Sequence, residues 1–168
     1  ALATARALGQ PAVDLAYGGK GLPGYLSAWV PLSVTTEGSI ANARAGVTAA
    51  LAKARATPGF ALDLMTRDLA LQGLVAPQLA LGDSPVEGAV VTLTPTALHY
   101  DANRLPTPEA KALADRIAHV ATEIARLPAE TTLNEVSALT ETERAQVLHG
   151  WNATQAPRAD TTIHQAFE

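Results

Sequence analysis

Hydrophobic residues in this chain repeat with two different periods, and this limits the folds open to it. Near the start, Val13, Leu15 and Tyr17 alternate with smaller or polar residues, which is the pattern of a strand with one buried face. Further on, apolar residues recur at spacings of three and four, which is the pattern of an amphipathic helix. Because the two periods occur in one chain, the sequence predicts an α/β fold.

Three further segments have strand character. Residues 25–34 are predicted to form a second strand, and Pro31 inside it lacks an amide hydrogen, which favours an edge position or a bulge. Residues 89–94 and 97–101 are β-prone runs separated by a Pro-Thr pair, so we expect a hairpin. The expected core-facing side chains of this hairpin are Val91, Leu93, Leu98 and Tyr100.

Two helices are predicted in the first half of the chain. Ser39 is a suitable N-cap for the first, which should end at residues 57–59. Its apolar positions are Ile40, Ala43, Val47, Leu51 and Ala54. A shorter helix over the same core is expected from Phe60, Leu62, Met65 and Leu69. Residues 74–85 have no clear period and contain Pro and Gly, so a connecting loop is predicted.

The strongest helical pattern comes later, with Thr107 as the expected N-cap and Pro108 at the first helical position. Its apolar stripe is Leu113, Ile117, Val120, Ile124 and Leu127. Beyond a short polar connector, Thr140 and Glu143 match a capping box that opens a helix through Leu148, with Gly150 as its stop. Residues 151–161 then have the character of a linker.

Composition excludes several classes of protein. Of the 168 residues, 48% are hydrophobic and 17% charged, which suits one globular core. The net charge of −4 gives no reason to bind nucleic acid, and no apolar run reaches the roughly 20 residues that span a bilayer. We therefore expect a cytoplasmic protein that binds neither nucleic acid nor membrane. The absence of cysteine excludes disulfides and thiolate chemistry.

Few side chains suggest catalysis. His119 has Asp115 and Glu123 four residues away on either side, which could offer a metal one imidazole and two carboxylates. A solvated, charge-paired helix face is the stronger interpretation, because these residues lie off the apolar stripe. His99 has Tyr100 and Asp101 beside it, but neighbouring strand residues point to opposite faces of a sheet.

Residues 139–168 contain an ordered set of motif residues: Leu139, Thr140, Glu143, Arg144, Leu148, Trp151, Asn152, Thr154, Ile163, His164, Phe167 and Glu168. In these residues and their spacing, the segment resembles the junction between condensation and adenylation domains of nonribosomal peptide synthetases. Residues 22–34 and 98–105 resemble two strand segments from the C-terminal lobe of the condensation domain. The Ser27–Trp29 segment and Ser33 depart from the family pattern, which usually has an Asn-Thr-like pair and an arginine there.

The resemblance implies a mixed sheet flanked by helices, similar to one lobe of the chloramphenicol acetyltransferase-like fold. It divides the chain into a truncated condensation-like lobe (1–130), a linker with a short helix (131–160) and the start of an adenylation domain (161–168). The family's catalytic HHxxxDG motif belongs to the other lobe and is absent from this sequence. We therefore predict no catalytic, cofactor-binding or metal-binding residue in this chain.

The resemblance leaves three functions open. The first is a noncatalytic scaffold for the following adenylation domain in the same polypeptide. The second is the excised C-terminal half of a condensation domain that forms amide bonds between carrier-bound thioesters, and the third is a docking domain for a carrier protein. The first residue is Ala and the first eight are helix-prone, which suggests an excised piece.

Aromatic residues are only 4% of the chain, so its tryptophans stand out. Trp29 is interpreted as core or interface packing, and Trp151, which follows a helix stop, is expected to dock on a neighbouring domain or lobe. The predicted interface residues are Trp151, Asn152, Leu148, Trp29 and Tyr25. Self-association through the exposed lobe face is expected unless that face is polar. The implied cofactors belong to partners: phosphopantetheine to a carrier domain, and ATP with Mg²⁺ to the adenylation domain.

Overall fold

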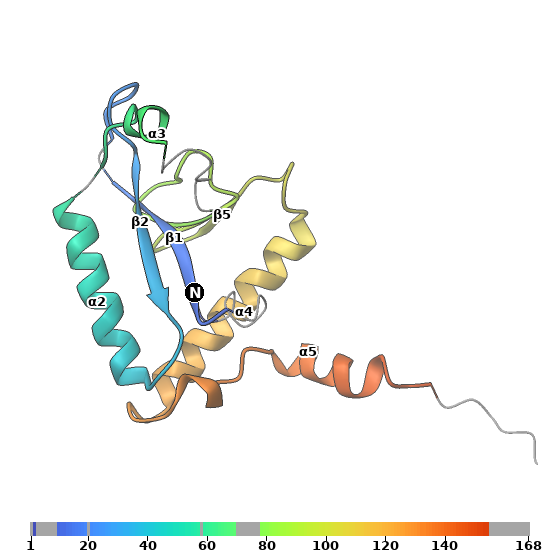
Figure 1. Ribbon diagram of the computed structural model, residues 1–168. Helices are drawn as coiled ribbons and strands as arrows, with labels where there is room; N and C mark the ends of the chain where they lie inside the picture. The colour runs from blue at the N-terminus through green and yellow to red at the C-terminus, as the bar shows by residue number, and fades with distance from the viewer. Residues whose placement is uncertain (1, 3–9, 20, 58, 70–77, 155–168) are drawn as a thin grey trace, which may run out of the picture. The chain divides into compact units, whose positions relative to one another are not determined.

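The computed structural model describes residues 2, 10–19, 21–57, 59–69 and 78–154. The chain divides into two compact units, Ala1–Ala138 and Leu139–Glu168 (Figure 1). The first unit contains a sheet and helices, and the second contains a short helix.

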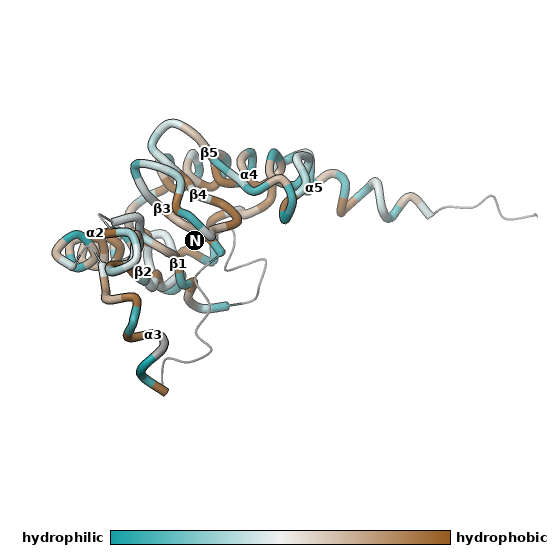
Figure 2. Tube along the Cα trace, turned by 90° about the horizontal axis from the view of Figure 1, so that it is seen from above, coloured by the Kyte–Doolittle hydropathy of each residue, from teal (hydrophilic) through white to brown (hydrophobic). Residues whose placement is uncertain are grey.

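The first unit is built on a five-stranded sheet. Its strands are β1 (Ala12–Gly18), β2 (Trp29–Thr35), β3 (Leu79–Leu81), β4 (Val91–Leu93) and β5 (Leu98–Tyr100). They lie in the order β2-β1-β3-β4-β5, which can be followed in Figure 2. β1 pairs antiparallel with β2 and parallel with β3, β3 pairs parallel with β4, and β4 pairs antiparallel with β5. The mixed sheet and its helices confirm the predicted α/β class.

Pro31 lies on the edge strand β2, as its missing amide hydrogen required. In the β1–β2 ladder, the amide of Thr36 donates to the carbonyl of Pro11 and that of Gly19 donates to the carbonyl of Ala28, both at 2.9 Å. Hydrogen-bonded positions alternate along an antiparallel pair, so the nitrogen of Pro31 faces away from β1. An outside strand therefore meets no donor at that point of the edge.

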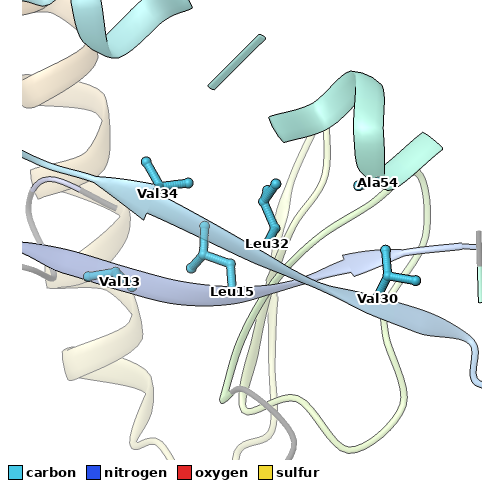
Figure 3. Packing of buried hydrophobic residues seen from close by; sticks show 6 residues of the cluster. All are labelled: Val13, Leu15, Val30, Leu32, Val34 and Ala54. Carbon is cyan, nitrogen blue, oxygen red and sulfur yellow. The ribbon is translucent and has the colours of Figure 1, made fainter. Parts of the chain in front are cut away.

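Helix α2 (Ile40–Ala56) covers one face of β1 and β2. Ser39 is its N-cap, because the Ser39 hydroxyl accepts a hydrogen bond from the amide of Asn42 at 3.2 Å, which confirms the predicted cap. The core between helix and strands is shown in Figure 3 and consists of Val13, Leu15, Val30, Leu32, Val34 and Ala54. Burying each of the larger of these side chains contributes about 1.5–3 kcal/mol.

The second strand starts later than predicted, at Trp29 rather than at residue 25. Leu22 forms a bridge with Leu26, and the amide of Leu26 donates to the carbonyl of Leu22 at 2.8 Å. The backbone around Tyr25 is thus engaged in a local turn. Hydrophobic residues at these positions gave the segment a strand-like appearance that the turn overrides.

The short helix after residue 60 was predicted to be longer and more buried than it is. Helix α3 covers only Leu64–Arg67, and Leu62 and Leu69 have exposed fractions of 39% and 81%. The prediction that these two leucines cover the core is therefore wrong, although Phe60 does pack against it. The side chain of Met65 lies outside the described residues.

Strand β3 corrects the prediction of a connecting loop at residues 74–85. Residues 79–81 form a central strand with parallel partners on both sides, while residues 74–77 lie outside the described residues. Three residues are too few to display a period, and the Gly82 that follows favoured a loop. The alanine in the middle, Ala80, is buried between its neighbours.

The predicted hairpin of β4 and β5 is confirmed, with Val91 opposite Tyr100 and Leu93 opposite Leu98. Of the four expected core residues, Val91 is buried and the other three are half-buried. Thr92 is buried on the opposite face, which was not predicted. Its hydroxyl accepts a hydrogen bond from the amide of Val86 at 3.1 Å, so the loop before β4 covers that face.

Helix α4 (Thr107–Arg126) begins one residue earlier than predicted. Pro106 is its N-cap, and Thr107 is the first helical residue rather than the cap. The Thr107 hydroxyl instead accepts a hydrogen bond from the hydroxyl of Tyr100 at 2.9 Å. The far end of the helix packs into a second core with the 3₁₀ turn η1 (Leu133–Glu135); its buried residues are Leu2, Ile40, Val120, Leu133 and Val136.

Candidate interaction surfaces

The second unit contains a helix that is capped by its own residues. α5 (Glu141–Ala145) continues into the π-helical turn η2 (Gln146–Gly150). At the start, the Thr140 hydroxyl accepts from the amide of Glu143 at 3.3 Å, and the Glu143 carboxylate accepts from the amide of Thr140 at 2.9 Å. This reciprocal pair confirms the predicted capping box.

The other end of this helix is capped by Asn152, a role that the sequence analysis missed. The Asn152 side-chain amide donates to the carbonyls of Val147 at 2.8 Å and Leu148 at 3.3 Å. The amide of Trp151 donates to the carbonyl of Gln146 at 2.9 Å, which closes the π turn. Carbonyls that a helix end normally leaves to water are therefore satisfied from within the segment. In the sequence, the Trp151-Asn152 pair directly after Gly150 was the feature from which this cap could have been predicted.

The apolar side chains of this capped helix are exposed. Trp151 and Leu148 have exposed fractions of 69% and 50%, and Val147 and Leu139 are exposed to a smaller extent. In residues 139–154, the described part of the second unit, no side chain is buried, so this stretch has no core of its own. Of the predicted interface residues, Trp151 and Leu148 thus form one apolar surface, with Asn152 fixing its end.

A second exposed apolar surface lies in the first unit, and we call it the 22–64 platform. Its side chains are Leu22, Tyr25, Leu26, Leu62 and Leu64, with exposed fractions from 39% to 72%. Two segments far apart in sequence meet there, as Figure 1 shows between the β1–β2 loop and α3. The amide of Leu62 donates to the carbonyl of Tyr25 at 2.9 Å, and Leu26 forms a bridge with Ala61.

Trp29 is packed within the first unit. Its ring meets the ring of Phe60 edge to face, with centroids 5.3 Å apart and planes at 84°. It also packs against the small cluster of Ala16, Ala80 and Val86. The structure thus separates two predicted interface residues, since Tyr25 is 72% exposed and Trp29 is half-buried.

The helix face around His119 differs from the solvated face that was predicted. The Oδ2 of Asp115 lies 3.9 Å from the Nζ of Lys111, and the Oε1 of Glu123 lies 2.6 Å from the Nη2 of Arg126. Both carboxylates are therefore paired. The His119 ring is half-buried, however, and its Nε2 is inaccessible and has no hydrogen-bond partner among the described residues. Over the same part of the chain, no group of three His, Asp or Glu residues could hold a metal ion.

Arg55, in the last turn of α2, has a shifted pKa. The Nε of Arg55 donates to the hydroxyl of Tyr17 at 3.1 Å, and this hydrogen bond raises the pKa of Arg55 above its ordinary value. The nearby Asp83 acts in the same direction. Arg55 therefore stays charged at any physiological pH.

No helix in the described residues is long and apolar enough to cross a membrane.

No protein-family model matches this chain. A curated protein does: the nonribosomal peptide synthetase vlms of a Lecanicillium species, which is 35% identical over 71 residues. Part of this chain is similar in sequence to a nonribosomal peptide synthetase. The matched stretch is 42% of this chain and 1% of the synthetase, so the chain spans only a very small part of that relative.

Proposed function

We propose that this chain is a noncatalytic, condensation-like module of a nonribosomal peptide synthetase that positions the adenylation domain of the same polypeptide. The observation that carries the proposal is the capped helix of the second unit, with Leu148 and Trp151 exposed on it. Exposed tryptophans of this kind are among the residues that dominate the binding energy of protein interfaces.

Both caps favour a docking role for this helix. Short isolated helices are marginal in water, and a segment that must fold on binding loses affinity to that ordering. Thr140 and Asn152 satisfy backbone groups at the two ends, which holds the helix in its binding conformation beforehand. ATP and Mg²⁺ would bind the adenylation domain and phosphopantetheine a carrier domain, so this chain would need no cofactor.

The test is binding between this chain and the separately expressed adenylation domain of the parent polypeptide, measured by calorimetry. Trp151→Ala should weaken binding by about tenfold or more, because a central aromatic anchor contributes about 2 kcal/mol. Leu69→Ala is the matched control, since Leu69 is 81% exposed in the first unit and lies outside the helix. Equal affinities for wild type and Trp151→Ala would refute the proposal.

A second candidate function is half of a catalytic condensation domain, and the 22–64 platform favours it. Exposed apolar groups held in place by backbone hydrogen bonds suit a surface that another lobe covers. The two functions differ in whether this chain takes part in forming a peptide bond. With this chain as the sole condensation lobe and two loaded carrier proteins as substrates, the noncatalytic proposal expects no peptide bond, and robust product would overturn it.

A further inference from the structure

A cavity in the first unit lies between α2 and the far end of α4. It encloses about 420 Å³, which is within the range of small-molecule sites. Its walls are apolar and include Val34 of β2, Val47 of α2, Ile124 of α4 and Leu133 of η1. Val34 and Leu133 are buried, while Val47 and Ile124 are half-buried, so the cavity is an open slot with an apolar floor.

One charge stands at this slot, the guanidinium of Arg44. Its Nη2 donates to the carbonyl of Ile124 at 3.4 Å, a long hydrogen bond that leaves most of its five donors free. None of the described residues that line the slot is acidic, and no carboxylate of the described part of the chain pairs with Arg44. The slot therefore combines an apolar floor with an uncompensated positive charge at its side.

The polar groups beside Arg44 are already committed to the protein. The Thr48 hydroxyl donates to the carbonyl of Arg44 at 2.8 Å, and the Thr36 hydroxyl donates to the carbonyl of Pro11 at 3.0 Å. A ligand rich in hydroxyl groups would find few free partners there. The groups that remain available are apolar carbons and the Arg44 donors, which suits a ligand with an alkyl chain and one anionic end.

We propose that this slot binds a small alkyl carboxylate, with the chain along Val47 and Ile124 and the carboxylate on Arg44. This site is independent of the docking helix and of the proposed scaffold function. The protein as a whole has a net charge of −4, so its overall field disfavours anions. A preference for an anionic ligand would then have to come from Arg44 itself.

The probes are octanoate, 1-octanol and octylammonium, titrated into the intact chain while amide chemical shifts are followed by NMR. Octanoate should shift the amides of Ala43–Thr48 and Ile124 saturably, with a Kd of about 1 mM or tighter for a ligand of this size. Octanol should bind more weakly, and octylammonium weakest. Absence of saturable shifts, or equal affinity for the three compounds, would overturn the proposal.

Variants separate the Arg44 charge from general electrostatics. Arg44→Met should weaken octanoate about fivefold, the effect of one largely exposed charge pair, and leave octanol unchanged. Lys53→Met removes the same charge from a position on α2 outside the slot and should leave octanoate unchanged. Thr48→Trp, an exposed substitution at the slot, should block both ligands. An equal loss in Arg44→Met and Lys53→Met would refute the site.

Discussion

A Cβ atom added to Gly59 would lie 2.9 Å from the carbonyl oxygen of Ser27, whereas one added to Gly46 would meet nothing within 4 Å. Ser27 is buried, and its amide donates a hydrogen bond to the carbonyl of Phe60. The backbone of Ser27 is therefore held in place, and its carbonyl oxygen has little room to move. We expect Gly59→Ala to lower the free energy of unfolding by about 1–3 kcal/mol.

The matched control is Gly46→Ala in the exposed interior of α2. Alanine has a higher helix propensity than glycine, so this change should raise the free energy of unfolding by about 0.5–1 kcal/mol. Urea unfolding of both variants and of the wild type measures these changes in the free energy of unfolding. Equal stabilities of Gly59→Ala and Gly46→Ala would show that the close approach of the two segments is absent in solution.

His119 gives a second prediction for a single residue. A buried nitrogen without a partner destabilises the fold, and replacing it with an apolar side chain removes that penalty. His119→Leu should therefore raise the free energy of unfolding by about 1 kcal/mol, measured by urea unfolding. His149→Leu, at an exposed position, should change it by less than about 0.5 kcal/mol. A lower stability for His119→Leu would mean that the ring has a partner beyond the described residues.

The caps illustrate what sequence reasoning can reach at this scale. The Ser39 cap and the Thr140–Glu143 box were predictable because they depend on residues three apart. The burial of the His119 Nε2 was not, because the burial of an atom depends on packing in the folded chain rather than on local sequence. Thr107 was predicted only in part. A threonine before a proline correctly indicated the start of a helix, but Pro106 already has the extended backbone that precedes the helix and is therefore the cap.

At the scale of elements, the second-unit helix depends on Asn152. Asn152→Ala removes two hydrogen bonds to the last carbonyls, each worth about 1 kcal/mol or less at an exposed site. We expect amide hydrogen exchange between Ala145 and Trp151 to accelerate about threefold to tenfold, with no change in the first unit. Thr154→Ala is the control, since Thr154 makes no hydrogen bond to this helix. Unchanged exchange in Asn152→Ala would rule out the capping role.

Element length decided which parts of the sheet could be predicted. β1 and α2 repeat their period over seven and 17 residues, and both were found from that repeat. β3 has three residues and exists because two parallel neighbours bind it, which no local pattern records. The mixed topology, with β3 inserted between β1 and β4, therefore becomes visible only in the folded chain.

For the molecule as a whole, the sequence led us to expect either self-association or a polar exposed face, and the first unit has features of both. The strand face opposite α2 exposes Asp14, Pro31 and Ser33, two of which are polar. The 22–64 platform is apolar and exposed. Among the described residues, exposed apolar side chains gather on the platform and, in the second unit, on the capped helix.

We therefore expect weak self-association of the chain, driven mainly by the platform in the first unit. Five partly exposed apolar side chains provide less area than the roughly 800 Å² per partner of a stable dimer, so the complex should dissociate on dilution. Sedimentation equilibrium should show a concentration-dependent increase in mass, and Tyr25→Ser should reduce it because Tyr25 is the largest exposed side chain there. Leu69→Ser, which removes an exposed leucine outside the platform, should not. A monomer at all concentrations that still binds an apolar dye strongly would contradict this view, because exposed apolar surface would then fail to drive association.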